Sequence, residues 1–374
     1  MERLDEALSA YLDSKAKAGD SGNYRRTAER VVGRWIAWCG ERAPPVDRVD
    51  EVEVRLLRRY ARHLRRRTAS GAIVGSTAHT YYAQVRAFLS WCVREELLAE
   101  NPAKKRRATE ELPDESAGKT GDGGPDQQFW SPDQREAIVR YVDDRAHEAI
   151  DDHGSAAVVE TRDRALVTLL AYAGVRGGEV LRSATDDRRR GLRWRAVDLD
   201  AGTARLLGKS QEREVAALPE QTRDPLAIHR RVLAPPTPDW PVFPTRHAPT
   251  LYRTVRERLP DRGWDEAEIE AALGDTGPTA VLRTAEVPPP SLTTAAGRTL
   301  LRRLTDEAGI KVEGEHDYLT LHGARRGVGE AVYRTHGAAA AQRTLRHSDP
   351  ATTAEMYTHV EASELAEEIS DAFD

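Results

Sequence analysis

Six residues in the second half of the chain carry side chains suited to cutting a phosphodiester bond without a metal ion. They are two arginines, a lysine, two histidines and a late tyrosine, namely Arg176, Lys209, His322, Arg325, His347 and Tyr357. A guanidinium offers a fixed fork of donors to non-bridging phosphate oxygens. An ammonium can protonate a leaving oxygen, and a phenol can form a covalent intermediate. These residue types therefore predict phosphoryl transfer through a tyrosine, with no cofactor and no metal.

Local sequence patterns predict where these side chains stand. Lys209 falls in the turn of an expected hairpin, with strands over 203–208 and 213–218. His322 and Arg325 are spaced i and i+3, so they share one face if a helix begins there. Asp349 followed by proline predicts a helix start that places Tyr357 on the third turn.

Taken singly, each residue also has an ordinary interpretation. Arg176 could be a surface arginine, Lys209 a turn lysine and Tyr357 a packed tyrosine of a terminal helix. His322 and Arg325 could belong to a solvated helix face. The order of all the motifs along the chain favours a shared site.

In that order, the motifs resemble those of the tyrosine recombinase family, the phage-type integrases. AYAGVRGGEVLRS is similar to the first arginine box of that family, and LHGARRG to its His-x-x-Arg signature. TLRHSDPATTAEMYTHV resembles its final box, with two departures. Arg346 replaces the usual glycine before His347, and the gap from His347 to Tyr357 is one residue longer than the commonest form.

The resemblance implies a role for each residue. Arg176 and Arg325 would clamp the scissile phosphate, His347 would donate to it, and His322 would accept a proton or bind the phosphate. Tyr357 would attack in line.

Two further roles also follow from the resemblance. Lys209 would protonate the leaving 5′ oxygen, and Glu179 would orient the site around the first arginine. The product of the attack would be a 3′-phosphotyrosine.

The first hundred residues predict four or five helices, because apolar residues recur there at helical spacing. Breakers at 19–22, 44–45 and 70–71 separate the helices, and Asn101-Pro102 ends the block. This block resembles the SAM-like helical core-binding domain of the family. The expected fold is mainly α with a small antiparallel β-sheet.

Composition divides the chain into further segments. We expect a DNA-binding domain over 1–107, a flexible acidic linker over 108–127, a catalytic domain over 128–360 and an acidic tail over 361–374. Ser131-Pro132 predicts the first helix of the catalytic domain. The stretch 219–290 is rich in proline and poorly periodic, which predicts loops and short helices. The tail has apolar residues at helical spacing, so it could dock on a neighbouring protomer or on its own domain.

The formal net charge of −5 conceals basic patches. Acidic residues concentrate in 108–126 and in the tail, and the remainder of the chain is net positive. Basic patches bind phosphate backbones whatever the overall sign. The candidate DNA-binding residues are all basic: Arg58, Arg62, Arg65, Arg66, Lys104, Lys105, Arg106 and Arg326.

The sequence thus predicts a cytoplasmic, site-specific recombinase or integrase, with double-stranded DNA as partner and dimers to tetramers on it. Cys39 and Cys92 are expected to be buried thiols, with a disulfide as the alternative. Two other functions stay open. One is a catalytically impaired DNA-binding protein of the same fold, and the other is a strand-relaxing topoisomerase.

Overall fold

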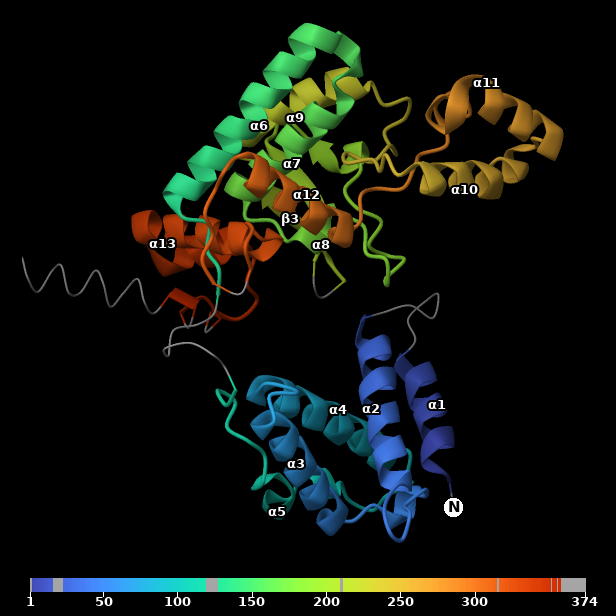
Figure 1. Ribbon diagram of the computed structural model, residues 1–374, viewed down its shortest axis with the longest axis vertical. Helices are drawn as coiled ribbons and strands as arrows, with labels where there is room; N and C mark the ends of the chain where they lie inside the picture. Colours follow the sequence, from blue (N-terminus) through green and yellow to red (C-terminus); the bar gives the residue numbers. More distant parts are fainter. Residues whose placement is uncertain are drawn as a thin grey trace, which may run out of the picture. The chain divides into compact units, whose positions relative to one another are not determined.

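The computed structural model describes residues 2–15, 23–118, 127–208, 211–314, 316–350, 352–354 and 356–357. The chain divides into two compact units, one made by residues 1–125 with 185–187 and the other by 126–184 with 188–374 (Figure 1). Lys209 and the predicted tail lie outside the described residues. Across the ranges above, no helix has the length and apolar character needed to cross a membrane.

The N-terminal unit is a helical bundle with an aromatic core. Its helices are α1 (Leu4–Lys15), α2 (Asn23–Gly40), α3 (Val54–Ala69), α4 (Gly75–Arg94) and the short α5 (Arg106–Thr109). Tyr11, Trp35 and Phe88 are fully buried at its centre. Cys39 and Cys92 are buried free thiols, as predicted, and burial raises the pKa of each to about 12.

The first part of the predicted linker is structured and differs from the expectation. Ala108 is fully buried, and the backbone N–H of Gly75 donates to the carbonyl of Ala117 over 2.7 Å. Glu111 forms ion pairs with Arg58, Arg62 and Arg65 of α3. Residues 108–118 therefore pack on the N-terminal unit, because paired carboxylates and one buried methyl group offset the polar composition. Residues 119–126 lie outside the described part.

The C-terminal unit is mainly helical and is built around α7. Its elements are α6 (Pro132–His153), α7 (Val158–Ala173), α8 (Gly177–Val180), β1 (Val197–Asp198), β2 (Thr203–Leu207), β3 (Arg213–Ala217), α9 (Glu220–Leu233), α10 (Ala248–Arg258), α11 (Glu266–Thr284), α12 (Thr294–Glu307) and α13 (Leu321–Leu345). Most of α7 is buried, and α6, α9 and α13 pack on it (Figure 1). Ser131 caps α6 with Pro132 in its first turn, as the sequence predicts.

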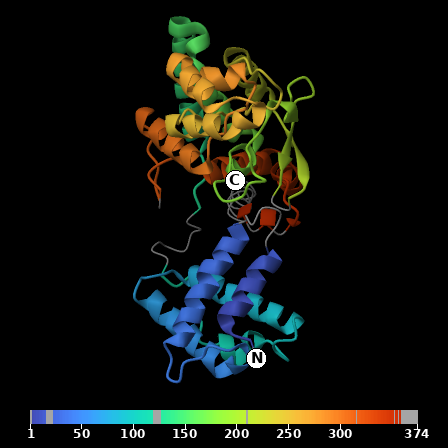
Figure 2. The ribbon, with the colours of Figure 1, turned by 90° about the vertical axis from the view of Figure 1, so that its right-hand side faces the viewer.

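The three strands form one antiparallel sheet in the order β1-β2-β3 (Figure 2, yellow-green arrows). Thr203 pairs with Ala217 and Leu207 with Arg213 in the hairpin. The predicted hairpin and the mainly helical fold class are therefore confirmed.

The proline-rich stretch 219–290 holds more helix than its composition suggests. It contains α9, α10 and α11, and α10 and α11 pack against each other. Leu226 and Leu233 of α9 are buried in the core. The prolines between α9 and α10 do mark an irregular connection, but tertiary burial stabilises the flanking helices despite their weak periodicity.

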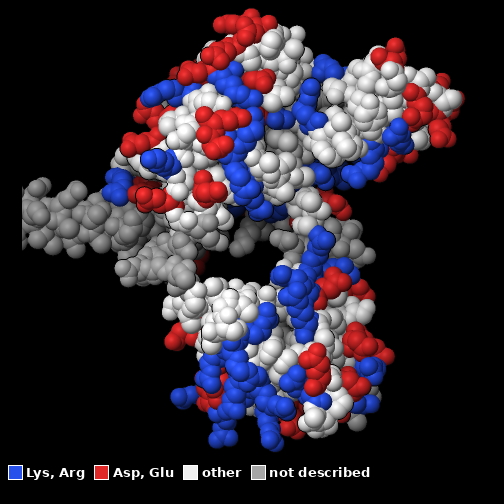
Figure 3. Space-filling view, in the orientation of Figure 1, with Lys and Arg blue, Asp and Glu red and all other residues white. Residues whose placement is uncertain are grey.

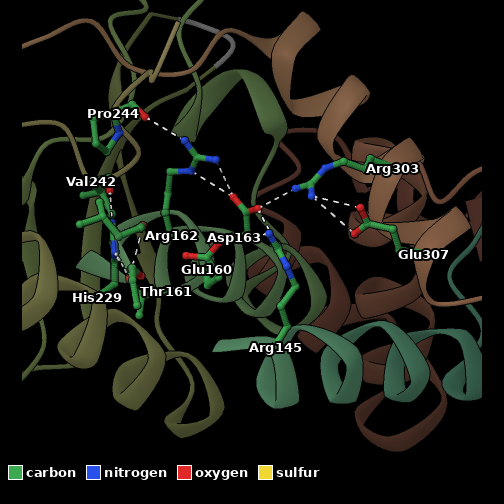
Figure 4. Close-up of polar contacts among 12 residues, drawn as sticks. Arg145, Glu160, Thr161, Arg162, Asp163, His229, Val242, Pro244, Arg303 and Glu307 are labelled. Carbon is green, nitrogen blue, oxygen red and sulfur yellow. Dashed lines mark hydrogen bonds and ion pairs between the residues drawn. The ribbon is translucent and has the colours of Figure 1, made fainter. Parts of the chain in front are cut away.

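A buried carboxylate connects three helices of this unit. The side chain of Asp163 is 0% exposed and lies among Arg145, Arg162 and Arg303 (Figure 4). Its Oδ2 accepts from Arg145 over 3.2 Å and from Arg303 over 2.9 Å, while Oδ1 accepts from Arg162 over 2.7 Å. Because a buried charge is tolerated only when paired and hydrogen-bonded, this cluster fixes α6 and α12 on α7.

Candidate active site

Arg176 follows the end of α7. Gly174 ends the helix in the left-handed region at φ 58°, which glycine adopts without strain. Glu179 of α8 then accepts from the backbone N–H of Arg176 and from its Nη1, each over 2.7 Å. The carboxylate is buried, with 1% of its side chain exposed. Glu179 thus orients the first arginine, and 26% of the Arg176 side chain remains exposed.

Arg325 is buried on α13 and contacts the ends of two helices. Its Nη1 donates to the carbonyl of Gly174, just after α7, and its Nη2 donates to the carbonyl of Leu345, the last residue of α13. Helix C-termini present unpaired carbonyls and partial negative charge, which suits a guanidinium. Burial, and then repulsion by Arg176, lower the pKa of Arg325 to about 9, so it stays charged at neutral pH.

His322 is the second residue of α13, one turn before Arg325, and it is exposed. Desolvation by the surrounding protein and the charges of Arg326, Arg325 and Arg176 lower its pKa to about 4. The imidazole is therefore neutral at physiological pH.

Two residues that the sequence reasoning missed hold this end of α13. Gln128 donates to the carbonyl of Tyr318 over 2.8 Å and accepts from the N–H of Thr320 over 2.6 Å. The indole of Trp130 donates to the carbonyl of Thr320 over 3.0 Å. These contacts join residues about 190 positions apart, so no local pattern could reveal them.

His347 lies in the turn that follows α13. Its Nδ1 is 2.9 Å from the hydroxyl of Thr353. Desolvation, together with the charges of Arg325 and Arg176, lowers the pKa of His347 to about 4. The residue before it, Arg346, adopts a left-handed conformation with φ 54°. His347 is thus a neutral imidazole close to both predicted clamping arginines.

Tyr357 is fully buried, whereas the in-line attack implied by the resemblance requires a phenol that can reach a DNA phosphate. Its ring centroid lies 5.3 Å from that of Tyr333 and 6.2 Å from that of Phe129, and its hydroxyl donates to the carbonyl of Arg326 over 3.3 Å. Burial raises the pKa of Tyr357, and the charge of Arg325 opposes that shift. The described residues around it, Pro350, 352–354 and 356–357, have helical backbone, as predicted, but the phenol is buried within the protein.

The remaining predicted residues lie in several settings. Lys209 is outside the described residues, although β2 and β3 on either side of its turn are in place. Lys and Arg gather over α3 and α5 of the N-terminal unit (Figure 3). The exposed members of this group are Arg62, Arg65, Arg66, Lys104, Lys105 and Arg106, whereas Arg58 and, in the C-terminal unit, Arg326 are half-buried.

The C-terminal unit therefore brings four of the predicted residues into one electrostatic cluster. The charges of Arg176 and Arg325 lower the pKa of both His322 and His347. The charge of Arg325 also opposes the rise in the pKa of Tyr357. Donors fixed before a ligand arrives are what a transferring phosphate needs. The arrangement can bind an anion and has neutral bases beside it.

Comparison with known proteins agrees with this architecture, although no family model matches the chain. The chain is 27% identical over 264 residues to tyrosine recombinase XerC of Xylella fastidiosa strain M23, covering 69% of this chain and 74% of the relative. The same figures hold for tyrosine recombinase XerC of strain Temecula1.

Solved structures of recombinases share the fold. XerH recombinase bound to its difH substrate matches with a TM-score of 0.58 at 14% identity, covering 99% of this chain and 85% of that one. A lambda integrase dimer bound to a COC′ core site matches with a TM-score of 0.55 at 12% identity, covering 95% and 77%. The Tn1549 transposon integrase with transposon end DNA gives 0.58 at 12%, covering 98% and 100%. The chain is thus similar in sequence to tyrosine recombinases and shares the fold of recombinases and integrases of known structure.

Proposed function

We propose that this protein is a site-specific recombinase that cuts and rejoins DNA through a 3′-phosphotyrosine intermediate. The observation that carries the proposal is the electrostatic cluster of Arg176, Arg325, His322 and His347 beside Tyr357. Guanidiniums there are oriented by a buried carboxylate and by helix ends, so they need little rearrangement to receive a phosphate.

In the proposed reaction, Arg176, Arg325 and His347 hold the non-bridging oxygens of the scissile phosphate. The phenolic oxygen of Tyr357 forms a bond to phosphorus while the bond from phosphorus to the 5′ oxygen breaks. The phenol proton passes to neutral His322 or to solvent, and Lys209 gives a proton to the departing 5′ oxygen. A 5′ hydroxyl of the partner strand then reverses the step, so the bond energy is conserved.

The buried phenol gives this mechanism a preceding step. Tyr357 must leave its contacts with Tyr333 and Phe129 before it can reach a DNA phosphate. We infer that DNA binding draws the tyrosine-bearing turn from its packed position. The bond to the Arg326 carbonyl is a single neutral hydrogen bond, whose net contribution is about 1 kcal/mol.

The partners follow from the same proposal. Double-stranded DNA carrying specific sites is the substrate, and Arg58, Arg62, Arg65, Arg66, Lys104, Lys105, Arg106 and Arg326 contact its backbone. The protein assembles on DNA as a dimer to tetramer in the cytoplasm, as part of a mobile element. The lambda integrase structure, which is a dimer on its core site, supports the expectation of self-association.

Covalent capture tests the assignment of the nucleophile. The full chain is incubated with a library of randomised nicked duplexes, in which the short fragment that carries the freed 5′ hydroxyl diffuses away after cleavage, and covalently bound DNA is recovered after denaturation. Wild type should retain DNA and Tyr357→Phe should retain none. Tyr333→Phe is the matched control, because it removes the neighbouring phenol and should still capture. Capture of DNA by Tyr357→Phe would show that another residue is the nucleophile.

A catalytically impaired DNA-binding protein of the same fold is the second candidate, and the burial of Tyr357 favours it. A mobility-shift assay, combined with covalent capture, distinguishes these two candidate functions. Specific binding of duplexes by wild type without any covalent capture would support the impaired protein. Capture of DNA that depends on a recurring sequence would support the recombinase, whereas relaxation of arbitrary supercoiled DNA would indicate a topoisomerase.

A further inference from the structure

Arg346 occupies a backbone position that disfavours a side chain. It ends α13 with φ 54° and ψ 48°, a left-handed conformation that glycine adopts freely and other residues adopt at a cost. A glycine here would need no compensation, so an arginine at this position requires contacts that offset the strain.

The side chain of Arg346 makes those contacts with two carboxylates. Its Nη2 donates to Oε2 of Glu179 over 2.6 Å, and its Nε donates to Oε2 of Glu214 over 3.1 Å. Only 10% of the Arg346 side chain is exposed, and only 1% of that of Glu179. Charge-assisted hydrogen bonds in such a shielded setting are stronger than exposed ion pairs.

Each of the two carboxylates belongs to a different part of the candidate active site. Glu179 also binds the backbone and side chain of Arg176, so one carboxylate serves both arginines. Glu214 lies on β3. Its Oε1 lies so close to Gly208 that a Cβ at residue 208 would overlap this oxygen. The carboxylate of Glu214 therefore rests against the backbone that ends β2.

A second arginine strengthens the same connection. Nη1 of Arg189 donates to the carbonyls of Gly178 over 3.1 Å and Leu207 over 3.0 Å, and its Nη2 donates to that of Gly208 over 2.7 Å. The start of the β2–β3 turn is thus joined to α8 through Arg189 and to the end of α13 through Arg346.

We propose that Arg346 is a positioning residue that fixes the β2–β3 hairpin and the His347 turn on the first arginine. This inference rests on the proposed function. Three N–H groups of Arg346 donate to Glu179, Glu214 and the carbonyl of Thr344, and these contacts give the residue a positioning role. Its effect on the reaction passes through the hairpin, whose turn carries the proposed general acid in the sequence.

A substrate with a sulfur in place of the bridging 5′ oxygen tests this role. A thiolate leaves without a proton, since thiols have a pKa of about 8.5, so cleavage of this substrate does not need a positioned acid. Single-turnover cleavage of both substrates is measured on a sequence recovered by the capture experiment. Arg346→Gln should slow the oxygen substrate about 10- to 100-fold and the sulfur substrate by no more than about 3-fold.

Three further variants separate positioning from folding. Arg346→Gly eases the backbone, so it should be at least as stable as wild type and still lose cleavage of the oxygen substrate. Glu214→Gln should reproduce the Arg346→Gln defect, and the double variant should be no slower than either single one. Arg343→Gln, which changes an exposed arginine of the same helix end, should cleave both substrates at the wild-type rate.

The outcomes are distinguishable. Equal slowing of both substrates by Arg346→Gln would show that the residue acts on the phosphate or on folding, and unchanged rates would show no role. Either result overturns the proposal. Failure of the wild type itself to form a covalent product with either substrate would instead contradict the proposed function.

Discussion

The hydroxyl of Tyr357 lies against the backbone of Gly329, so closely that a Cβ at residue 329 would overlap the phenolic oxygen. Gly329 belongs to α13, four residues after Arg325, and the same helix carries the predicted site residues His322, Arg325 and Arg326. The absence of a side chain there creates the space that holds the phenol in its buried position. The resting place of the tyrosine is thus set by a residue 28 positions earlier in the chain.

Gly329→Ala should displace Tyr357 from this space. We expect the phenol to become accessible and its pKa to fall toward the ordinary value, with a stability loss of about 1–3 kcal/mol from overpacking. Tetranitromethane nitration followed by peptide mass analysis would show faster modification of Tyr357. Gly274→Ala is the control, because a Cβ at residue 274 of α11 meets nothing within 4 Å. An unchanged nitration rate in Gly329→Ala would show that the packing is not decisive.

Glu111→Gln should strengthen DNA binding. Glu111 forms ion pairs with Arg58, Arg62 and Arg65 of α3, and the neighbouring arginines lower its pKa, chiefly through the hydrogen bond from Arg62. A DNA phosphate that binds these arginines must displace the carboxylate. Removing the charge should therefore lower the Kd for duplex DNA several-fold at low salt and steepen the salt dependence.

Asp114→Asn provides the matched control for that variant, because it removes the same charge from an exposed residue of the same segment. Its Kd should change much less, which would separate a local effect on α3 from a change in net charge. Equal effects of the two substitutions would contradict a DNA-binding role for the α3 arginines.

The unfolding free energy should fall as pH drops from 6.5 toward 4, partly because of His229. This histidine is fully buried, with Nε2 2.8 Å from the Val242 carbonyl and Nδ1 3.1 Å from the Thr161 hydroxyl (Figure 4). Burial lowers its pKa to about 4. Between pH 6.5 and 4, His229 therefore binds a proton in the unfolded chain but stays neutral in the folded chain.

The contribution of His229 is present above pH 6.5 and is lost toward pH 4, by up to about 3 kcal/mol. Urea unfolding at several pH values would measure it. His229→Gln should flatten the dependence in this window, while His322 and His347, whose pKa values are also about 4, preserve part of it. Identical slopes for variant and wild type would contradict the assignment.

The features that sequence predicts well here are those with local causes. The stop at Gly174, the cap at Ser131 and the hairpin around Lys209 each follow from a few neighbouring residues. Their positions in the chain already indicate where Arg176 and the sheet must stand.

The features that sequence misses depend on distant partners. Glu214 and Arg346 are 132 positions apart, and the brace of Gln128 on Thr320 spans 192. The acidic composition of 108–118 suggested a free linker, but α3 supplies arginines that pair with it. Likewise, nothing near Tyr357 reveals that a glycine on α13 receives its hydroxyl.

Arg325 shows how closely architecture and chemistry are combined in this molecule. Its guanidinium binds carbonyls at the ends of α7 and α13, so any substitution at residue 325 removes the hydrogen bonds that join these two helix ends, and every substitution except lysine also removes the cation. The same bonds keep that cation immobile before any anion approaches. Rigidity at this point is thus supplied by the scaffold, and a lysine, with a single flexible ammonium, could not restore it.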